Sequence, residues 1–457
     1  IQVSGVTDSQ KVHVMHELSK EHPWRLVVTY DDNRAKEIYD DFSYFEPNTW
    51  LYPARDLLFY SSDIHGNLLT RQRMQVFKHL MEDVGGTVVT TVDGLMDHLL
   101  PLSMMKERRI LVESGEVLDI GDMKERLRDL GYERTGQVDG MGQFSIRGGI
   151  VDIFPLTEEL PVRIELWGDE VDSIRSFDPE SQRSVEQLEE VVLYPATEIV
   201  LTPEQVEMGL ERITKSEKSY EKTLREQFQT EEAHRIRSII EEFKENLKDG
   251  MATGSLDSYL TYFCQDTVSF AEYFPAEETA VFLDEPIRLK ERGEAVETEF
   301  RESMAGRLEK GYLLPGQLNL LYSYKDVVMK LNRFHCTSLC MMEAKSGDYK
   351  VKDSFHLEVR SVSSFNNSFE LLAQELGDWK KKGYRTVLLS ASRTRAKRLA
   401  EDLRGFGLNS FYSEDTDRVV QKGEILVLHG SIRRGYEYPM IRFGVLSESD
   451  IFGKEKK

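Results

Sequence analysis

The stretch VRIELWGDEVDSIRSFDPESQRS, residues 162–184, decides the fold of its region because its first six residues alternate between apolar and polar side chains. Successive side chains of a β-strand point to opposite faces of the sheet. One set is therefore expected to face the core: Val162, Ile164 and Leu166. The other set is expected to face outward: Arg163, Glu165 and Trp167. The turn signals GD at 168–169 and DP at 178–179 predict that neighbouring segments follow through short turns.

The preceding stretch, FSIRGGIVDIFP at residues 144–155, shows the same alternation. Phe144 and Ile146 are expected to face inward, whereas Ser145 and Arg147 are expected to face outward. The Gly-Gly pair breaks this strand, and the apolar run after it starts a second strand that ends before the proline.

Residues 109–198 are therefore predicted to form a small inserted α+β domain, with an antiparallel sheet and a helix over 123–130. Its outer face would carry two arginines, a glutamate and a tryptophan: Arg147, Arg163, Glu165 and Trp167. Arginine and tryptophan are the residues most enriched at energetically important positions of protein interfaces. Two interpretations remain open, because Trp167 can equally cover the edge of the local core while the charges only solvate the sheet.

The segments on both sides of this insert follow another pattern, in which short apolar runs alternate with helical stretches. Strands are expected over residues 25–30, 86–92 and 279–283. After the second strand we expect a helix that stops at Pro101. This pattern is typical of a parallel sheet with helices on its faces, so residues 1–108 and 199–345 are predicted to form one α/β domain. Acidic and basic residues alternate at helical spacing over 201–249, which is typical of a solvated helical face.

The last hundred residues are predicted to form a separate, small α/β domain over 354–453. A strand is expected at 385–390, a helix at 393–403 and a further strand at 424–428. The segment 425–439 is similar to the strand and loop of a helicase second lobe, although an ordinary strand and polar loop explain it as well. Its role stays open.

Residues 5–12, GVTDSQKV, have nearly the spacing of a phosphate-binding P-loop. In that motif the second glycine lets backbone N–H groups wrap the phosphates, the lysine reaches the β- and γ-phosphates, and a hydroxyl binds Mg²⁺. Only Gly5 and Lys11 are retained here. Gln10 replaces the second glycine and Val12 replaces the hydroxyl residue, so we expect a degenerate nucleotide site.

An acidic pair, Asp284 and Glu285, follows the expected strand at 279–283. In a working ATPase such a pair would hold Mg²⁺ and orient water, but here it has no intact phosphate loop to serve. Two solvated acids at a strand end are an equally ordinary explanation. We therefore expect no catalytic residues, no bound cofactor and no ATP turnover.

The composition narrows the remaining classes of function. The chain has 457 residues, 40% of them hydrophobic and 30% charged, and a net charge of −21, which disfavours general nucleic-acid binding. No apolar run approaches the roughly 18–20 residues of a membrane span, and a cytoplasmic protein is expected. The three cysteines, Cys264, Cys336 and Cys340, do not provide the four ligands of a structural zinc site, and no nuclease or hydrolase constellation is evident.

Three stretches of the chain resemble a known family. FSIRGGIVDIFP (144–155), VRIELWGDEVDSIRSFDPESQRS (162–184) and YPATE (194–198) are similar to the UvrB-type domain shared by UvrB and the transcription-repair coupling factors. LYPARD (51–56) and TRQRMQVFKHL (70–80) resemble the first domain of the same proteins. The resemblance implies a degenerate helicase-like (RecA-like) parallel-sheet domain, an inserted UvrB domain-2-like unit and a separate small α/β domain.

Two differences between this chain and UvrB indicate which of the two kinds of relative it resembles more. UvrB keeps an intact P-loop and inserts a long aromatic hairpin, whereas this chain has only residues 61–69 at the comparable place. In both respects the chain resembles the N-terminal part of the transcription-repair coupling factors. That family would contact RNA polymerase and DNA through parts absent from this chain, and its full-length members would be ATP-dependent DNA translocases.

The resemblance implies that the β domain binds UvrA and brings nucleotide excision repair to stalled RNA polymerase. The implied contact residues are Arg147, Arg163 and Trp167, with Glu165 as a neighbour, although the family often has phenylalanine in place of the tryptophan. The alternative is an active, UvrB-like ATP-dependent helicase that handles damaged DNA. Arg71 and Arg73 raise the question of direct DNA contact, but arginines in a helical run more often only solvate it.

Overall fold

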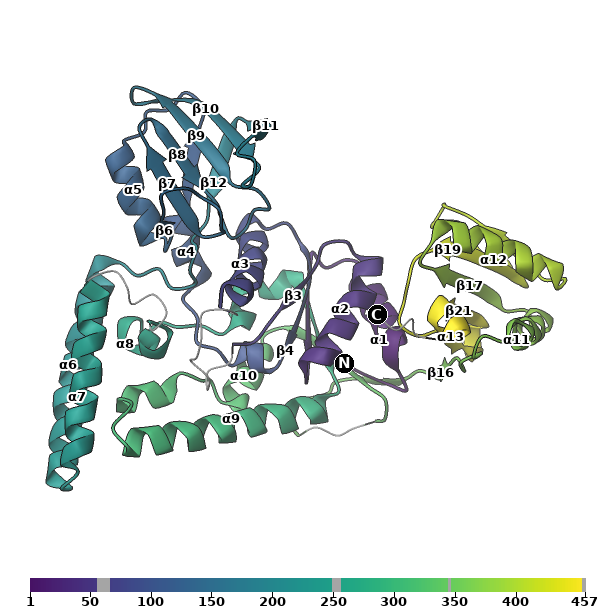
Figure 1. The fold of residues 1–457 in the computed structure, drawn as a ribbon. Coiled ribbons are helices and arrows are strands. Elements are labelled where there is room, and N and C mark those ends of the chain that lie inside the picture. The colour runs from purple at the N-terminus through teal and green to yellow at the C-terminus, as the bar shows by residue number, and fades with distance from the viewer. Residues whose placement is uncertain (56–65, 249–255, 344–346, 454–457) are drawn as a thin grey trace.

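The computed structural model describes residues 1–55, 66–248, 256–343 and 347–453. Figure 1 shows a central α/β body, a β-rich domain above it, a smaller α/β body beside it, and a long helical hairpin along the opposite side. Three stretches named above extend outside the described residues: Asp56 of LYPARD, residues 61–65 of the short stretch, and residue 249.

The central body is built on a seven-stranded sheet in the order β15-β1-β14-β13-β2-β4-β3, in which all the paired strands are parallel. Its strands are β1 (Gln2–Ser4), β2 (Trp24–Thr29), β3 (Thr49–Tyr52), β4 (Gly86–Thr91), β13 (Thr279–Asp284), β14 (His335–Cys340) and β15 (Ser354–His356). Every residue of β2, β4 and β13 is buried, as expected for strands covered on both faces. The predicted parallel α/β fold is confirmed.

Helices cover both faces of this sheet: α1 (Asp8–Leu18), α2 (Asp32–Phe45), α3 (Gly66–Glu82), α4 (Leu102–Arg108), α9 (Pro286–Glu309) and α10 (Tyr324–Leu331). The predicted helix before Pro101 is wrong. Only a short 3-10 turn, η1 (Asp93–Leu95), lies there, and Pro101 is instead the N-cap of α4. Proline fits a helix start because it has no N–H group to leave unpaired.

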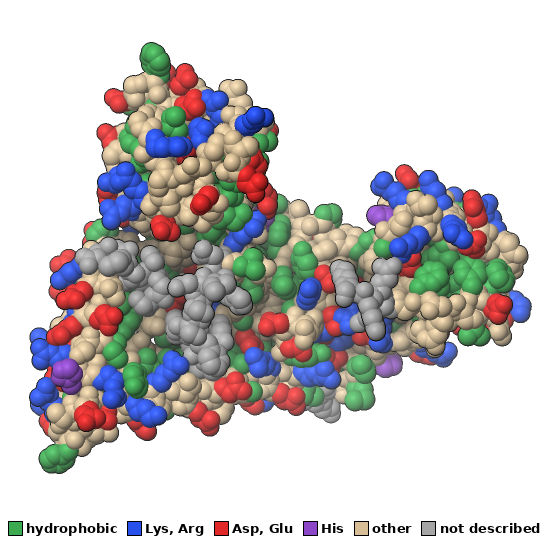
Figure 2. All heavy atoms as spheres, in the orientation of Figure 1, with side chains coloured by type: hydrophobic (Ala, Val, Ile, Leu, Met, Phe, Trp, Pro, Cys, Tyr) green, Lys and Arg blue, Asp and Glu red, His purple; other side chains and the backbone are tan. Residues whose placement is uncertain are grey.

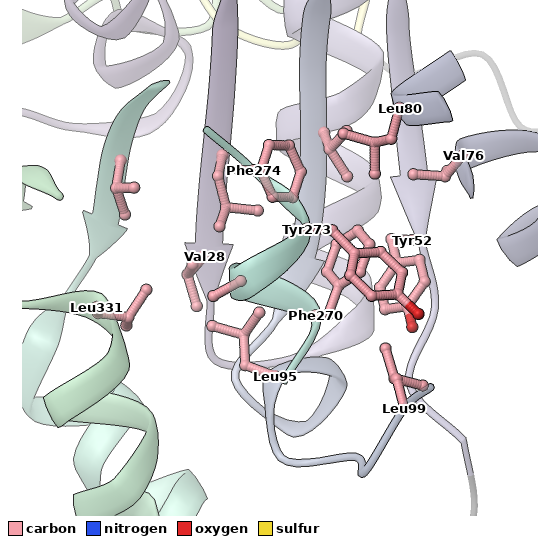
Figure 3. Close-up of a cluster of buried hydrophobic side chains, with 14 of the residues drawn as sticks. Val28, Tyr52, Val76, Leu80, Leu95, Leu99, Phe270, Tyr273, Phe274 and Leu331 are labelled. Carbon is pink, nitrogen blue, oxygen red and sulfur yellow. The ribbon is translucent and has the colours of Figure 1, made fainter. Parts of the chain in front are cut away.

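The core on one face of the sheet contains packed aromatic rings among aliphatic side chains (Figure 3). Tyr52 and Phe270 stack with ring centroids 3.5 Å apart, and Tyr273 packs edge-on against Phe77. Phe270 and Tyr273 lie in the 3-10 turn η3 (Phe270–Tyr273), far along the chain from Tyr52. The core therefore joins the segments before and after the insert into one body.

The charged region after residue 201 forms the helical hairpin of α6 (Pro203–Glu226) and α7 (Thr230–Lys248), as its pattern predicts. Its inner side packs through apolar side chains against α8 (Leu260–Phe263). Figure 2 shows lysine, arginine, aspartate and glutamate side chains interspersed along the hairpin's visible face. The hairpin exposes a solvated surface of mixed charge.

The inserted domain has a six-stranded sheet in the order β11-β10-β9-β8-β7-β6, antiparallel except for the β6–β7 pair. Its strands are β6 (Glu133–Arg134), β7 (Gln143–Arg147), β8 (Ile150–Ile153), β9 (Val162–Trp167), β10 (Glu170–Phe177) and β11 (Ser184–Leu188). Helix α5 (Ile120–Asp129) contributes Met123 and Leu127 to the core on the inner face. A two-stranded pair, β5 (Ile110–Glu113) with β12 (Glu190–Leu193), forms where the chain enters and leaves this domain.

The smaller α/β body holds a sheet in the order β16-β20-β21-β17-β19-β18. Its elements are β16 (Arg360–Ser361), α11 (Phe369–Lys381), β17 (Arg385–Ser390), α12 (Arg393–Gly405), β18 (Asn409–Tyr412), β19 (Glu424–His429), β20 (Tyr436–Tyr438), β21 (Phe443–Ser447) and α13 (Glu448–Phe452). The predicted strand–helix–strand unit is present, with an antiparallel edge formed by β20 and β16.

Candidate functional site

The outer face of the inserted sheet carries arginines held by one buried carboxylate. Asp152 on β8 lies between Ser145 of β7 and Arg163 of β9 in the strand register. Its Oδ1 accepts a hydrogen bond from Arg163 Nε at 2.6 Å, and its Oδ2 accepts from an Arg163 terminal nitrogen at 2.9 Å. The same Oδ2 accepts from Arg147 at 2.7 Å. Two guanidinium groups therefore share one negative charge.

The two arginine side chains differ in how much of their surface is exposed to a binding partner. The Arg163 side chain is 16% exposed, lies over the Phe177 ring at 4.5 Å, and also donates to Gln182. The hydrogen bonds that Arg163 donates to Asp152 outweigh burial and raise the pKa of Arg163. The Arg147 side chain is 47% exposed. Arg163 is a fixed, planar donor, whereas Arg147 projects from the surface.

Trp167, the last residue of β9, is 84% exposed. Beside it on the same face, Glu165 is half-buried and forms an ion pair with Arg175 of β10. Val162 and Ile164 lie in the core, with Leu166 packed against it, as the alternation predicts. The predicted face of Arg147, Arg163, Glu165 and Trp167 is thus brought together, and the interpretation of Trp167 as a cover for the local core is not supported.

One position on this face differs from the expectation. Ser145 is 2% exposed and donates a hydrogen bond to the carbonyl oxygen of Gly136, so its predicted exposure is wrong. A second small core of Val138, Phe154 and Phe177 lies beside it. The segment around residues 136–138 covers part of the outer face, which strand alternation alone does not reveal.

The sequence analysis also missed Asp152 and Arg175. Asp152 stands in the apolar run IVDIF, where an acidic residue is costly unless it is paired. An acid at this position, one strand away from two arginines, is the signal that could have identified it.

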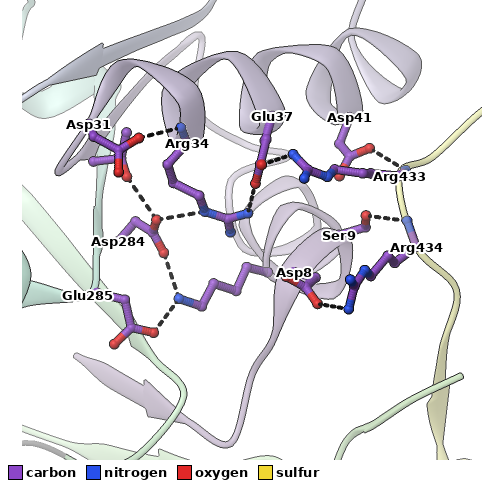
Figure 4. A network of polar contacts seen from close by, with 12 residues as sticks. Asp8, Ser9, Asp31, Arg34, Glu37, Asp41, Asp284, Glu285, Arg433 and Arg434 are labelled. Carbon is purple, nitrogen blue, oxygen red and sulfur yellow. Dashed lines mark hydrogen bonds and ion pairs between the residues drawn. The ribbon is translucent and has the colours of Figure 1, made fainter. Parts of the chain in front are cut away.

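The residues of the predicted degenerate nucleotide site are paired with one another (Figure 4). Lys11 is 3% exposed, and its Nζ lies 2.6 Å from Asp284 Oδ1 and 2.6 Å from Glu285 Oε1. Asp284 also accepts hydrogen bonds from Thr29 and Arg34. Burial alone would raise the pKa of Asp284, but Lys11 and Arg34 outweigh it and lower that pKa. The structure therefore brings the retained lysine and the acidic pair together as a satisfied internal ion pair.

The turn that would wrap phosphate is covered by backbone. A Cβ added to Gly5, whose φ is +79°, would lie 2.2 Å from the carbonyl oxygen of Leu357 and 2.8 Å from Cε1 of His356. Gln10 accepts a hydrogen bond from the N–H of Thr7, and Val12 is buried in the core. The segment after β15 lies where a phosphate loop needs open space.

Arg73, one of the arginines considered for DNA contact, is fully buried. Its guanidinium pairs with Glu198 at 2.9 Å and Asp97 at 2.9 Å and lies 4.4 Å from the centroid of the Tyr52 ring. Arg55 pairs with the same Glu198 at 2.5 Å. Glu198 is the last residue of the YPATE motif, where the chain leaves the inserted domain. This ion cluster therefore holds that segment against the central body.

Metal-ligand clusters and membrane-spanning helices are two further features that could define a site within the described ranges. No group of three or more His, Cys, Asp or Glu side chains there is placed to hold a metal ion. Each helix among those residues is too short or too polar to cross a membrane. Arg71 forms an ion pair with Glu159.

Comparisons with known proteins show which family the chain resembles. The family model described as the UvrB interaction domain matches residues 110–199. The transcription-repair-coupling factor of Bacillus subtilis (strain 168) is 30% identical over 437 residues, 94% of this chain and 36% of the relative. That of Staphylococcus epidermidis is 25% identical over 460 residues, 100% of this chain and 38% of the relative. The chain thus spans little more than a third of the length of these curated relatives.

Proposed function

The chain corresponds to the N-terminal region of the transcription-repair-coupling factors, and on that premise we propose that its inserted domain binds UvrA through Arg147, Arg163 and Trp167. Binding there brings nucleotide excision repair to stalled RNA polymerase. Contacts with RNA polymerase and DNA belong to the rest of the longer protein.

The observation that carries the proposal is an exposed tryptophan on the same sheet face as a fixed guanidinium group, that of Arg163, and a half-exposed one, that of Arg147. Asp152 and the Phe177 ring fix Arg163, so little side-chain entropy is lost when a partner binds it. Trp167 offers a large, rigid apolar surface that water covers in the free chain. Arginine and tryptophan are the residue types that supply most binding energy at protein interfaces.

The test is a binding titration of the chain with purified UvrA, comparing the unaltered chain with Arg147→Glu. This variant suits the test because the Arg147 side chain is already half in solvent, so its removal leaves the core intact. We expect affinity to fall by about 30-fold or more, the loss typical of a residue worth about 2 kcal/mol at an interface. Arg163→Glu should abolish binding, but it also places a second carboxylate against Asp152.

The matched control is Arg126→Glu on α5, which packs on the inner side of the sheet and has a half-exposed arginine paired with Asp122. It makes the same charge change in the same domain and should bind UvrA normally. Equal losses in Arg126→Glu and Arg147→Glu would mean that only net charge matters. Full binding by Arg147→Glu with unchanged circular dichroism would refute the assigned surface.

We also propose that this region does not turn over ATP. The support is that Lys11 is bound to Asp284 and Glu285, and that Leu357 lies against Gly5. Titration calorimetry with ATP and Mg²⁺ should give no heat of binding. Saturable binding together with DNA-stimulated hydrolysis would instead support the UvrB-like helicase alternative.

A further inference from the structure

The loop between β19 and β20 reaches from the C-terminal α/β body to the helices beside the remnant nucleotide site (Figure 4). The guanidinium of Arg433 forms an ion pair with Glu37 of α2, and its backbone N–H donates to Asp41 at 2.7 Å. The backbone N–H of Arg434 donates to the hydroxyl of Ser9 at 3.1 Å. The guanidinium of Arg434 also forms an ion pair with Asp8 at 3.6 Å. Two arginines of one body thus meet three acids and a hydroxyl of the other.

Tyr438 on β20 makes the second part of this contact. Its hydroxyl accepts a hydrogen bond from Gln10 at 3.0 Å and lies 2.8 Å from Nδ1 of His13. The His13 ring also stacks on Tyr436, with centroids 5.8 Å apart. Gln10 is the residue that replaces the second glycine of the P-loop motif. Gln10 therefore supplies a hydrogen-bond donor to the C-terminal body.

The contact is continuous with the closed nucleotide site. A chain of ion pairs runs through Lys11, Asp284, Arg34, Glu37 and Arg433, each member touching the next. The first four residues belong to the central body and the last to the C-terminal body. Hydrogen-bonded groups linked in a network strengthen one another, so the network can contribute more than its separate pairs.

The surfaces also fit closely beside these ion pairs. A Cβ added to Gly430, at the start of the loop, would lie 2.1 Å from the Tyr44 ring. Leu428, Ile432 and Tyr436 form an apolar cluster against which Tyr44 packs. Apolar packing and paired charges therefore occur together, as in a specific interface.

We propose that the remnant nucleotide site has become a docking site for the chain's own C-terminal α/β domain. The side chains of Ser9, Gln10 and His13, together with the two acids of α2, hold this domain in one orientation on the central body. The altered P-loop position occupied by Gln10 thus has a binding role, and its partner is the 430–438 segment. The role concerns the C-terminal domain and is independent of UvrA binding.

Hydrogen exchange of the full chain, read by peptide mass spectrometry, tests the docking. The amides of Arg433 and Arg434 donate across the contact, so undocking should expose them. In Arg433→Glu a negative charge faces Glu37 and Asp41, and we expect exchange in peptides covering 431–436 to accelerate about tenfold or more. Peptides covering β17 and β19 should keep their protection, which shows that the domain stays folded.

The matched control is Arg393→Glu, because Arg393 is exposed at the start of α12. It lies near Tyr412 on β18, and β18 is at the opposite edge of the sheet from β16 and β20. It should leave exchange of the loop unchanged. Tyr438→Phe, which removes only the hydroxyl bound by Gln10, is the milder variant and should accelerate exchange severalfold. High salt should speed loop exchange in the unaltered chain, because it screens the Arg433–Glu37 pair.

Unchanged loop protection in both Arg433→Glu and Tyr438→Phe would overturn the proposal. Equal acceleration in Arg393→Glu would overturn it as well, because the effect would then follow net charge. If Arg433→Glu unfolds the domain, so that β17 and β19 also lose protection, Tyr438→Phe alone decides the outcome.

Discussion

Asp152 and Arg163 form a bidentate pair across neighbouring strands, with both carboxylate oxygens occupied by guanidinium nitrogens at 2.6 and 2.9 Å. The carboxylate is almost fully buried, so it cannot itself touch a partner to any extent. Its effect on binding must therefore act through the position and charge of the arginines. Asp152 is a positioning residue of the proposed interface.

Replacing this acid should weaken binding without removing any exposed contact. Asp152→Asn leaves one oxygen for two arginines and points an amide N–H₂ toward them. We expect the affinity for UvrA to fall about tenfold and the free energy of unfolding to fall by about 1–3 kcal/mol. Binding titrations and urea denaturation measure the two effects. Unchanged affinity in a correctly folded variant would show that Arg147 and Arg163 need no such support.

Removing the exposed tryptophan should separate binding from stability. Trp167→Ala takes away a side chain that makes few contacts in the free chain, so we expect the free energy of unfolding to change by less than about 0.5 kcal/mol. The affinity for UvrA should fall by about tenfold or more. A large loss of stability would mean instead that the indole covers the local core.

The buried cluster around Arg73 should be among the most sensitive points of the fold. Arg73→Met keeps the length of the side chain but leaves Asp97 and Glu198 without their shared cation. Removing one partner of a buried ion pair costs about 3–5 kcal/mol. Urea denaturation should show this loss, while Arg71→Met, which breaks only the pair with exposed Glu159, should cost less than about 1 kcal/mol. Similar losses in the two variants would contradict the role given to burial.

The acid Asp41 should make stability depend on pH in the direction opposite to most carboxylates. Burial raises the pKa of Asp41 to about 6, although hydrogen bonds from Ser9 and Arg433 favour its charged form. Because the folded chain then binds the proton more tightly than the unfolded chain, this contribution is fully present below pH 3.8 and is lost as the pH rises through about 6.

The corresponding test compares the chain with Asp41→Asn. The variant lacks this titration, so its stability relative to the unaltered chain should increase between pH 4 and pH 7, by up to about 3 kcal/mol when the pKa rises from 3.8 to about 6. Urea denaturation at a series of pH values measures the difference. A constant difference across this range would mean that Asp41 has an ordinary pKa.

Much of the architecture can be predicted from sequence periodicity, because burial of a strand on one or both faces determines the order of its apolar and polar residues. The apolar runs of β2, β4 and β13 predict a parallel sheet, and the alternation over residues 162–167 correctly separates Ile164 from Trp167. Such patterns depend only on whether each side chain meets the core or solvent.

Features that depend on distant segments could not be predicted in this way. Ser145 is covered by the segment at 136–138, and Lys11 is neutralised by acids more than 270 positions away in the chain. Pro101 fits two local structures equally well, because a proline can follow a helix or begin one. In each case the environment of the residue is set by segments that are distant in sequence, and a local sequence pattern contains no information about them.

The short strand β15 has a consequence for the behaviour of the isolated chain. It pairs with β1 through Gln2, Val3 and Ser4, which would otherwise form the edge of the central sheet. A bare edge presents free N–H and C=O groups that can pair with a strand of another molecule. Residues 354–356 take the edge position, so the backbone of β1 is paired on both sides. A version cut before residue 354 would leave the N–H and C=O groups of Gln2, Val3 and Ser4 unpaired on one side and open to a strand of another molecule.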